Sequence, residues 1–177
     1  MSTLAITRPQ RHRIVGGSVV LLLSIVAATV ALGGGRLSAD GDALPTESFE
    51  LFDGGTASFA DFGGKPLVIN FWASWCPACV GELPDIQAVH EALGDEVTFL
   101  GVANADSRGA ATALADEVGL TYTLADDPNG DLFRSLGLIA MPSTIFVTAD
   151  GQIQEVFGGQ LDEKALIARI EGLVEAS

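Results

Sequence analysis

Trp75-Cys76-Pro77-Ala78-Cys79 is the stretch that decides how this 177-residue chain is interpreted. It holds both cysteines of the sequence and directly follows the apolar run from Pro66 to Trp72, which is typical of a strand buried on both faces. Two intervening residues let the sulfurs close a small ring if the chain turns into a helix. Because a helix N-terminus favours a thiolate on the first cysteine, this pattern predicts a redox-active pair.

Two other uses of the cysteines stay open at this point. A structural disulfide would more often join distant segments, because closing a long loop constrains the unfolded chain more. A zinc site needs two further ligands at suitable spacing, and the only histidines are His12 and His90. Reversible thiol–disulfide chemistry is therefore the favoured interpretation, and we expect neither a bound metal nor a cofactor.

Residues 1–36 are predicted to lie outside the globular domain. Three arginines precede 22 uncharged residues from Ile14 to Gly35. A helix of that length crosses a bilayer of roughly 30 Å, and the basic flank predicts a cytoplasmic N-terminus. We expect a single-pass anchor in the cell membrane, with everything after Arg36 exported. A cleaved signal peptide, which would leave a secreted or periplasmic protein, is the alternative.

The charge distribution also separates the N-terminal segment from the remainder. All 23 acidic residues but only five of the nine basic ones follow residue 36, so the exported part carries a formal charge of −18. Such a field repels nucleic acid and anionic lipid headgroups, and we expect neither as a partner. Residues 37–46 contain Asp, Gly and Pro and are predicted to be a linker. Residues 47–177 have the length of one domain.

Strand and helix patterns alternate along this predicted domain. The predicted strands are residues 48–52, 56–59, 67–72, 97–103, 120–124, 143–148 and 153–157. The predicted helices follow Cys76 and Asp162 and cover residues 110–118 and 131–136 between them. This order, with a hairpin at each end, predicts an α/β domain of three layers.

Two separated motifs resemble a known family. The segment from Phe71 to Cys79 (FWASWCPAC), followed by Met141-Pro142-Ser143-Thr144, resembles the thioredoxin fold. More narrowly, it is similar to the membrane-anchored TlpA/ResA/DsbE-like thiol–disulfide oxidoreductases. The resemblance covers about residues 44–174. It implies a central mixed sheet flanked by helices, an N-terminal β-hairpin, and a helix–strand insertion at about residues 107–127 that plain thioredoxin lacks.

The resemblance implies roles for individual residues. Cys76 is expected to be the attacking thiol and Cys79 the resolving one, so that the two form the redox-active disulfide. Met141-Pro142 is expected to be a cis peptide facing that disulfide, with the Met141 backbone free to pair with a substrate strand. An ordinary trans proline at the start of an edge strand is the alternative. Trp75 offers a flat apolar rim for a peptide substrate, and Pro77 shapes the same surface.

A carboxylate is predicted near the two sulfurs. Glu82 stands three residues after Cys79, where ResA-like proteins carry a functional glutamate, and Asn70 stands where plain thioredoxin has a buried aspartate. The spacing places Glu82 on the same helix face as Cys79. We expect Glu82 to exchange a proton with Cys79, whereas a solvated helix residue is the alternative.

The expected function is extracytoplasmic thiol–disulfide exchange with the thiols and disulfides of exported proteins. The resemblance favours reduction, for instance of the haem-binding cysteines of apocytochrome c during cytochrome c maturation, with a membrane thiol carrier as electron partner. An oxidant or isomerase in the folding of exported proteins is the alternative. A non-catalytic metal or haem carrier is a remote one, because copper carriers of this fold usually combine CxxxC with a distant histidine.

Overall fold

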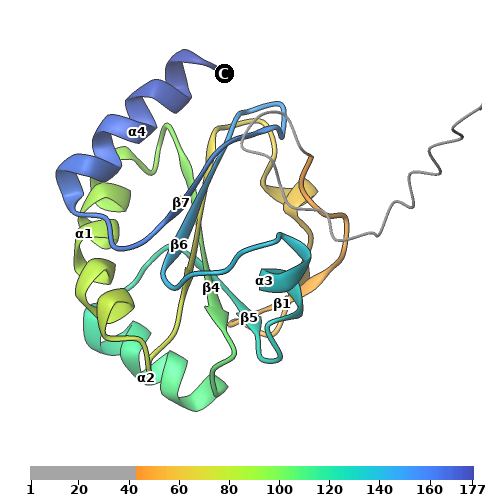
Figure 1. Ribbon diagram of the computed structural model, residues 1–177, viewed down its shortest axis with the longest axis vertical. Coiled ribbons are helices and arrows are strands. Elements are labelled where there is room, and N and C mark those ends of the chain that lie inside the picture. Colours follow the sequence, from red (N-terminus) through yellow and green to blue (C-terminus); the bar gives the residue numbers. More distant parts are fainter. Residues whose placement is uncertain (1–42) are drawn as a thin grey trace, which may run out of the picture. The chain divides into compact units, whose positions relative to one another are not determined.

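The computed structural model describes residues 43–177, which form one mixed sheet with helices on both faces (Figure 1). The predicted anchor (residues 1–36) and most of the predicted linker (residues 37–46) lie outside the described residues. Within residues 43–177, no helix has both the length and the apolar character that crossing a membrane requires.

Apart from a short 3-10 helix that the patterns do not predict, the elements follow one another in the predicted order. The strands are β1 (Phe49–Leu51), β2 (Thr56–Ala57), β3 (Leu67–Trp72), β4 (Thr98–Asn104), β5 (Thr123–Asp127), β6 (Ser143–Val147) and β7 (Ile153–Gly158). The helices are the 3-10 helix η1 (Phe59–Phe62), α1 (Pro77–Leu93), α2 (Arg108–Val118), α3 (Asp131–Ser135) and α4 (Glu163–Glu175).

The strand order β2-β1-β5-β4-β3-β6-β7 gives a mixed sheet, with β3 parallel to β4 and antiparallel to β6. Strands β1 and β2 form the predicted N-terminal hairpin, and α2 with β5 forms the predicted helix–strand insertion. The predicted fold class is therefore confirmed.

Strand β5 begins three residues later than the pattern predicts. The chain turns at Gly119 (φ 78°), and the N–H of Leu120 still bonds to the Ala115 carbonyl at the end of α2. Tyr122 then packs into the core on the side of α1 and α4 before the strand starts. Leu120 and Tyr122 are therefore packing residues of a connection, and pairing with β4 begins only at Thr123.

Central strand β3 contributes to the apolar packing on both faces of the sheet, because its side chains alternate between the two faces. Ile69 and Phe71 pack on the face that also receives residues of η1 and α3, whereas Val68 and Trp72 pack against residues of the other helices. Figure 1 shows α1 and α4 together on one side of the sheet and α3 on the other. Asn70 lies between Val68 and Trp72 along β3 and therefore faces α1.

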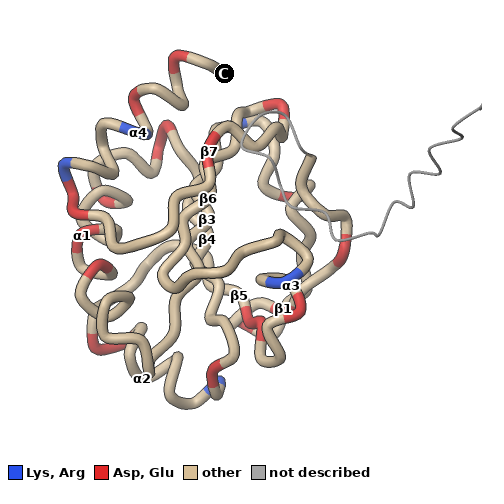
Figure 2. Tube along the Cα trace, in the orientation of Figure 1, with Lys and Arg blue, Asp and Glu red and all other residues tan. Residues whose placement is uncertain are grey.

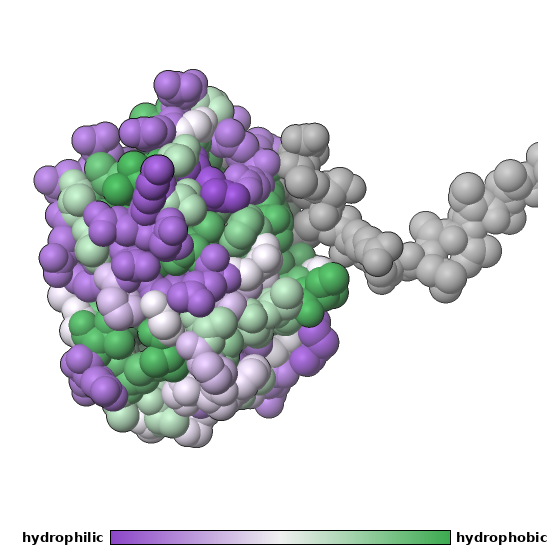
Figure 3. All heavy atoms as spheres, turned by 60° about the vertical axis from the view of Figure 1, so that its left-hand side comes forward, coloured by the Kyte–Doolittle hydropathy of each residue, from purple (hydrophilic) through white to green (hydrophobic). Residues whose placement is uncertain are grey.

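Charged residues lie outside the central strands β3, β4 and β6. Figure 2 shows many more acidic residues (red) than basic ones (blue), distributed over helices and connections rather than along the central strands. On the face that α1 and α4 cover, hydrophilic side chains dominate, with hydrophobic patches between them (Figure 3). Among residues 43–177, the acidic residues other than Glu82 and Asp127 are exposed or partly exposed.

Candidate active site

The two sulfurs lie where β3 passes into α1. Cys76 is the N-cap residue of α1, and its Sγ accepts the N–H of Cys79 at 3.2 Å. The two residues form a disulfide, with their Cα atoms 5.2 Å apart. Cys76 is 6% exposed and Cys79 is fully buried, so a large partner reaches the disulfide only through Cys76.

The start of α1 also provides the partial positive charge that the motif predicts next to the first cysteine. Pro77 occupies the first turn, where its missing N–H removes no helical hydrogen bond, and its side chain is exposed. The free N–H groups and the positive end of a 17-residue helix favour negative charge at Cys76. This arrangement suits a sulfur that must act as a thiolate and as a leaving group.

The connection between β4 and α2 supports the turn that precedes Cys76. The N–H of Ser74 donates to Oδ2 of Asp106 at 2.6 Å, and the indole N–H of Trp75 donates to the Ala105 carbonyl at 3.0 Å. Trp75 nevertheless remains 56% exposed, so its ring presents the predicted apolar surface. Asp106 was not predicted from sequence, although the carboxyl ends of neighbouring parallel strands such as β3 and β4 are expected to meet at one edge.

The peptide bond between Met141 and Pro142 is cis, as the resemblance implies. Met141 packs against the apolar cluster that contains Cys76 and Cys79. Gly159 N–H donates to the Pro142 carbonyl at 2.9 Å, whereas within residues 43–177 neither the N–H nor the carbonyl of Met141 has a hydrogen-bond partner. A polypeptide that approaches the disulfide therefore meets a free donor and acceptor at Met141.

Glu82 lies one turn after Cys79 on α1 and is completely buried. Its Oε1 accepts from Nδ2 of Asn70 at 2.8 Å, and its Oε2 accepts the N–H of Leu161 at 3.0 Å. The same Asn70 amide donates to Oγ1 of Thr144 at 3.2 Å. The alternative of a solvated residue is therefore wrong, and Glu82 links α1 to β3 and to the turn before α4.

Burial raises the pKa of Glu82 to about 7, because removal from water disfavours the carboxylate. The hydrogen bonds from Asn70 and Leu161 act in the opposite direction, and the nearby charge of Asp85 adds a small increase. Close to neutral pH, Glu82 can therefore either hold or release a proton one helical turn from Cys79. Among residues 43–177 there is no group of three or more His, Cys, Asp or Glu side chains arranged to hold a metal ion.

A disulfide at the start of a helix, one accessible sulfur and a neighbouring cis-proline define a thioredoxin-fold thiol–disulfide oxidoreductase. Comparison with known proteins agrees with this class. The chain belongs to the Redoxin family, which it matches over residues 39–172.

Individual relatives narrow the class to the ResA/DsbE type. The thiol-disulfide oxidoreductase ResA of Oceanobacillus iheyensis is 28% identical over 93% of this chain and 89% of its own length. The thiol:disulfide interchange protein DsbE of Pseudomonas fluorescens biotype C is 33% identical over 68% of both chains. Among solved structures, MTB DsbF superimposes with a TM-score of 0.68 and 31% identity over 73% of this chain and 98% of that one.

Proposed function

We propose that this protein reduces disulfides of exported proteins, from a position anchored to the outer side of the cell membrane. The observation that carries the proposal is the pairing of an accessible Cys76, at the N-terminus of α1, with a fully buried Cys79. In such a pair, the first sulfur can attack a substrate disulfide, and the buried second sulfur can then attack the mixed disulfide that results.

In the first step, the Cys76 thiolate of the reduced protein attacks one sulfur of a substrate disulfide. A mixed disulfide forms, and the other substrate sulfur leaves as a thiolate that takes a proton from water. Met141 contributes its free N–H and carbonyl to hold the substrate backbone in an extended form. The exposed Trp75 and Pro77 form the surrounding surface, and the buried Pro142 holds the Met141 backbone in place through the cis peptide bond.

In the second step, Cys79 gives its proton to the Glu82 carboxylate, and the resulting thiolate attacks Sγ of Cys76. The mixed disulfide breaks, the second substrate sulfur leaves as a thiolate that takes a proton from water, and the Cys76–Cys79 disulfide remains. Two electrons have then passed from the cysteine pair to the substrate. A membrane thiol carrier would return the protein to its reduced form, and apocytochrome c, whose haem-binding cysteines must be reduced, is the substrate we propose.

Replacement of each cysteine tests the two steps separately. Cys76→Ser should abolish reduction of insulin disulfides with dithiothreitol as the electron source. Cys79→Ser should instead accumulate a mixed disulfide, because attack still occurs and resolution does not. Full activity in both variants would contradict the mechanism.

The reduction potential of the pair decides the direction of electron flow, because the same residues would serve an oxidant. We expect a potential closer to the roughly −270 mV of thioredoxin than to the roughly −120 mV of DsbA. Equilibration with glutathione or dithiothreitol measures it. A value near that of DsbA would favour the alternative, oxidation or isomerisation of exported proteins during folding.

The proposed location is tested by topology and fractionation. A reporter that is active only after export should be active when fused after Ser177, and the full 18.3 kDa chain should fractionate with the membrane. A shorter protein that begins near residue 38 or 40 in the soluble fraction would replace the anchor with a cleaved signal.

A further inference from the structure

Asn104 is a buried polar residue to which the two proposed steps give no role. It is the last residue of β4 and is 6% exposed. Its Nδ2 donates to Sδ of Met141 at 3.6 Å. This distance is longer than that of a hydrogen bond to oxygen, because sulfur is a larger and weaker acceptor. Asn104 therefore contacts the side chain of the residue whose backbone is proposed to bind the substrate.

The backbone groups of Met141 are free, but the chain on either side of Met141 is held. Before it, the Ala140 carbonyl accepts a side-chain hydroxyl of β6 at 2.7 Å. After it, the Pro142 carbonyl accepts the N–H of Gly159 at 2.9 Å. Within residues 43–177, Asn104 supplies the one hydrogen bond to Met141 itself. This bond, together with apolar packing, therefore determines how firmly Met141 is held.

The direction of the Asn104 amide follows from its surroundings. A Cβ atom at Gly130 would lie 3.1 Å from Oδ1 of Asn104 and 3.1 Å from Nη1 of Arg134, so both atoms border the same small space. The positive charge of the guanidinium favours the amide oxygen on this side. In the opposite direction, the amide would turn its N–H groups toward the guanidinium and its oxygen toward the sulfur, which is also an acceptor. Arg134 therefore favours the orientation in which Nδ2 reaches Met141.

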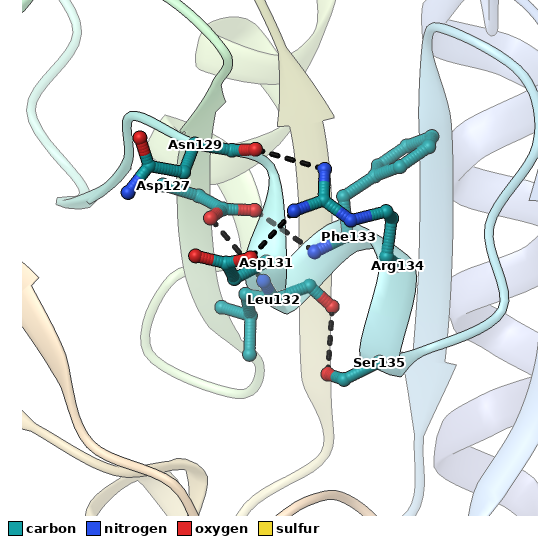
Figure 4. Close-up of polar contacts among 7 residues, drawn as sticks. All are labelled: Asp127, Asn129, Asp131, Leu132, Phe133, Arg134 and Ser135. Atoms are coloured by element: carbon teal, nitrogen blue, oxygen red, sulfur yellow. Dashed lines mark hydrogen bonds and ion pairs between the residues drawn. The ribbon is translucent and has the colours of Figure 1, made fainter.

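Arg134 is held beside this amide by the start of α3. Figure 4 shows its guanidinium donating to the Asn129 carbonyl and to the Asp131 carboxylate. The Asp127 carboxylate accepts two N–H groups of α3, at 3.2 and 2.8 Å, and so fixes the helix. Within the described residues, Oδ1 of Asn104 has no hydrogen-bond partner, so we expect this nearby positive charge to stabilise it.

The backbone after Asn104 is held in an unfavourable conformation. Ala105 has a φ of 48°, in the left-handed region that residues with a Cβ atom rarely adopt. Its N–H donates to the Asp127 carbonyl at 2.8 Å, and its carbonyl accepts the Trp75 indole N–H at 3.0 Å. Such a conformation persists where the surrounding contacts determine it, and it is often found at functional sites. The end of β4 thus contacts both segments next to the disulfide, through Trp75 and through Met141.

We propose that Asn104 is a positioning residue for substrate binding. It holds Met141 through the N–H···S bond, so that the free backbone groups of Met141 keep the position in which they pair with a substrate, and Arg134 keeps the amide in the required orientation. The inference rests on the proposed function and adds two residues to it. Within residues 43–177, Asn104 has no hydrogen bond to Glu82 or to either cysteine. Loss of Asn104 should therefore weaken substrate binding and leave the resolution step unchanged.

The kinetic test compares Asn104→Leu, which keeps the size and removes the donor, with Met141→Leu, which removes the sulfur. Full-length reduced protein, solubilised in detergent, is assayed with insulin. Asn104→Leu should raise KM about fivefold, the effect of one lost hydrogen bond, with kcat unchanged. The single-turnover rate of resolution should equal that of the wild type. In the Met141→Leu background, Asn104→Leu should change KM no further, because the acceptor is already absent.

The spectroscopic test observes Met141 directly. The chain has two methionines, Met1 and Met141, so a sample labelled with carbon-13 in the methionine methyl groups gives two signals. Asn104→Leu should shift the Met141 signal and leave the other in place. Arg134→Gln, at an exposed position, should shift the same signal and raise KM about twofold. Lys164→Gln, at an exposed position on α4, is the matched control and should change neither.

The outcomes separate this role from the proposed function. A wild-type KM in Asn104→Leu, an unchanged Met141 signal, or an equal effect on KM in the Met141→Leu background overturns the positioning role. Slower resolution in Asn104→Leu overturns it as well, because the residue would then act on the cysteine pair. If Asn104→Leu does not fold, a wild-type KM and methyl signal in Arg134→Gln overturn the proposal. Failure of the wild-type protein to reduce insulin overturns the proposed function and this inference with it.

Discussion

Nδ2 of Asn70 lies 2.8 Å from Oε1 of Glu82, in a part of the core where neither side chain reaches solvent. With the N–H of Leu161 on Oε2, both carboxylate oxygens have a donor. Among the described residues, Oδ1 of Asn70 has no hydrogen-bond partner. Rotation of the amide would bring that oxygen toward Glu82. Asn70 can therefore donate a hydrogen bond to the charged carboxylate through Nδ2 and accept one from the protonated carboxyl through Oδ1.

Glu82→Gln should slow resolution of the mixed disulfide and remove its pH dependence near neutrality. In the wild type, the rate should rise as pH passes through about 7, because Glu82 must be a carboxylate to accept the Cys79 proton. Glutamine fills the same space and cannot accept that proton, so we expect a rate about 100-fold lower. Stopped-flow measurement of single-turnover resolution between pH 5 and 9 checks this.

The matched control is Glu171→Gln, an exposed glutamate on α4. Its pH–rate profile should coincide with that of the wild type. Coinciding profiles for Glu82→Gln and the wild type would reduce Glu82 to a structural residue.

The contribution of Glu82 to the free energy of unfolding should fall as pH rises from about 4.5 to about 7. Its pKa is about 7 in the folded protein and 4.5 in the unfolded chain, so between these values only the folded state holds the proton. Complete deprotonation therefore costs on the order of 3 kcal/mol of unfolding free energy. Urea unfolding of the oxidised protein at pH 5 and pH 8 should show a smaller stability difference for Glu82→Gln. An equal difference in both proteins would contradict the raised pKa.

Asn70→Asp should keep the carboxyl pair protonated to higher pH. Two carboxyl groups at this position repel each other when both are charged, so the last proton should leave with an apparent pKa above about 7. Carbon-13 NMR titration of the side-chain carboxyls measures this value. Asn129→Asp, at an exposed position, is the control. A highest apparent pKa equal to that of the wild type would mean that residues 70 and 82 do not interact.

Local sequence patterns predict much of this site because its key residues are near neighbours in the chain. The apolar run at residues 67–72 is strand β3, and helical spacing alone places Glu82 on the face of Cys79. The burial of Glu82 and its bond to Leu161, 79 residues further on, depend on how α1 packs against the sheet and the turn before α4. Contacts between residues that meet only through tertiary packing cannot be predicted from the periodicity of the local sequence.

The same reasoning explains why the role of Asp106 and the starting residue of strand β5 were not predicted. From the sequence alone, Asp106 is one acidic loop residue among many on an acidic protein. Only the parallel pairing of β3 with β4 brings it close to Ser74. Residues 120–124 are apolar enough for a strand, but Leu120 and Tyr122 pack against the core before the ladder with β4 begins at Thr123. In both cases the deciding contact is made with a different element.

Asp106→Ala should loosen the turn that carries Trp75 and Cys76. The substitution removes the carboxylate that accepts the Ser74 N–H at 2.6 Å, a charged hydrogen bond in a partly buried position. We expect a loss of about 1–2 kcal/mol in unfolding free energy, because this N–H loses a charged acceptor. With the neighbouring Ala105 carbonyl less fixed, the Trp75 indole N–H should exchange faster with solvent in NMR spectra. Misplacement of Cys76 should lower kcat/KM for insulin reduction by about tenfold.

Asp106→Asn keeps an oxygen acceptor, so its stability, indole exchange and turnover should lie between those of the wild type and those of Asp106→Ala. If Asp106→Ala matched the wild type in urea unfolding, indole exchange and turnover, the Ser74–Asp106 bond would have no part in positioning the active site.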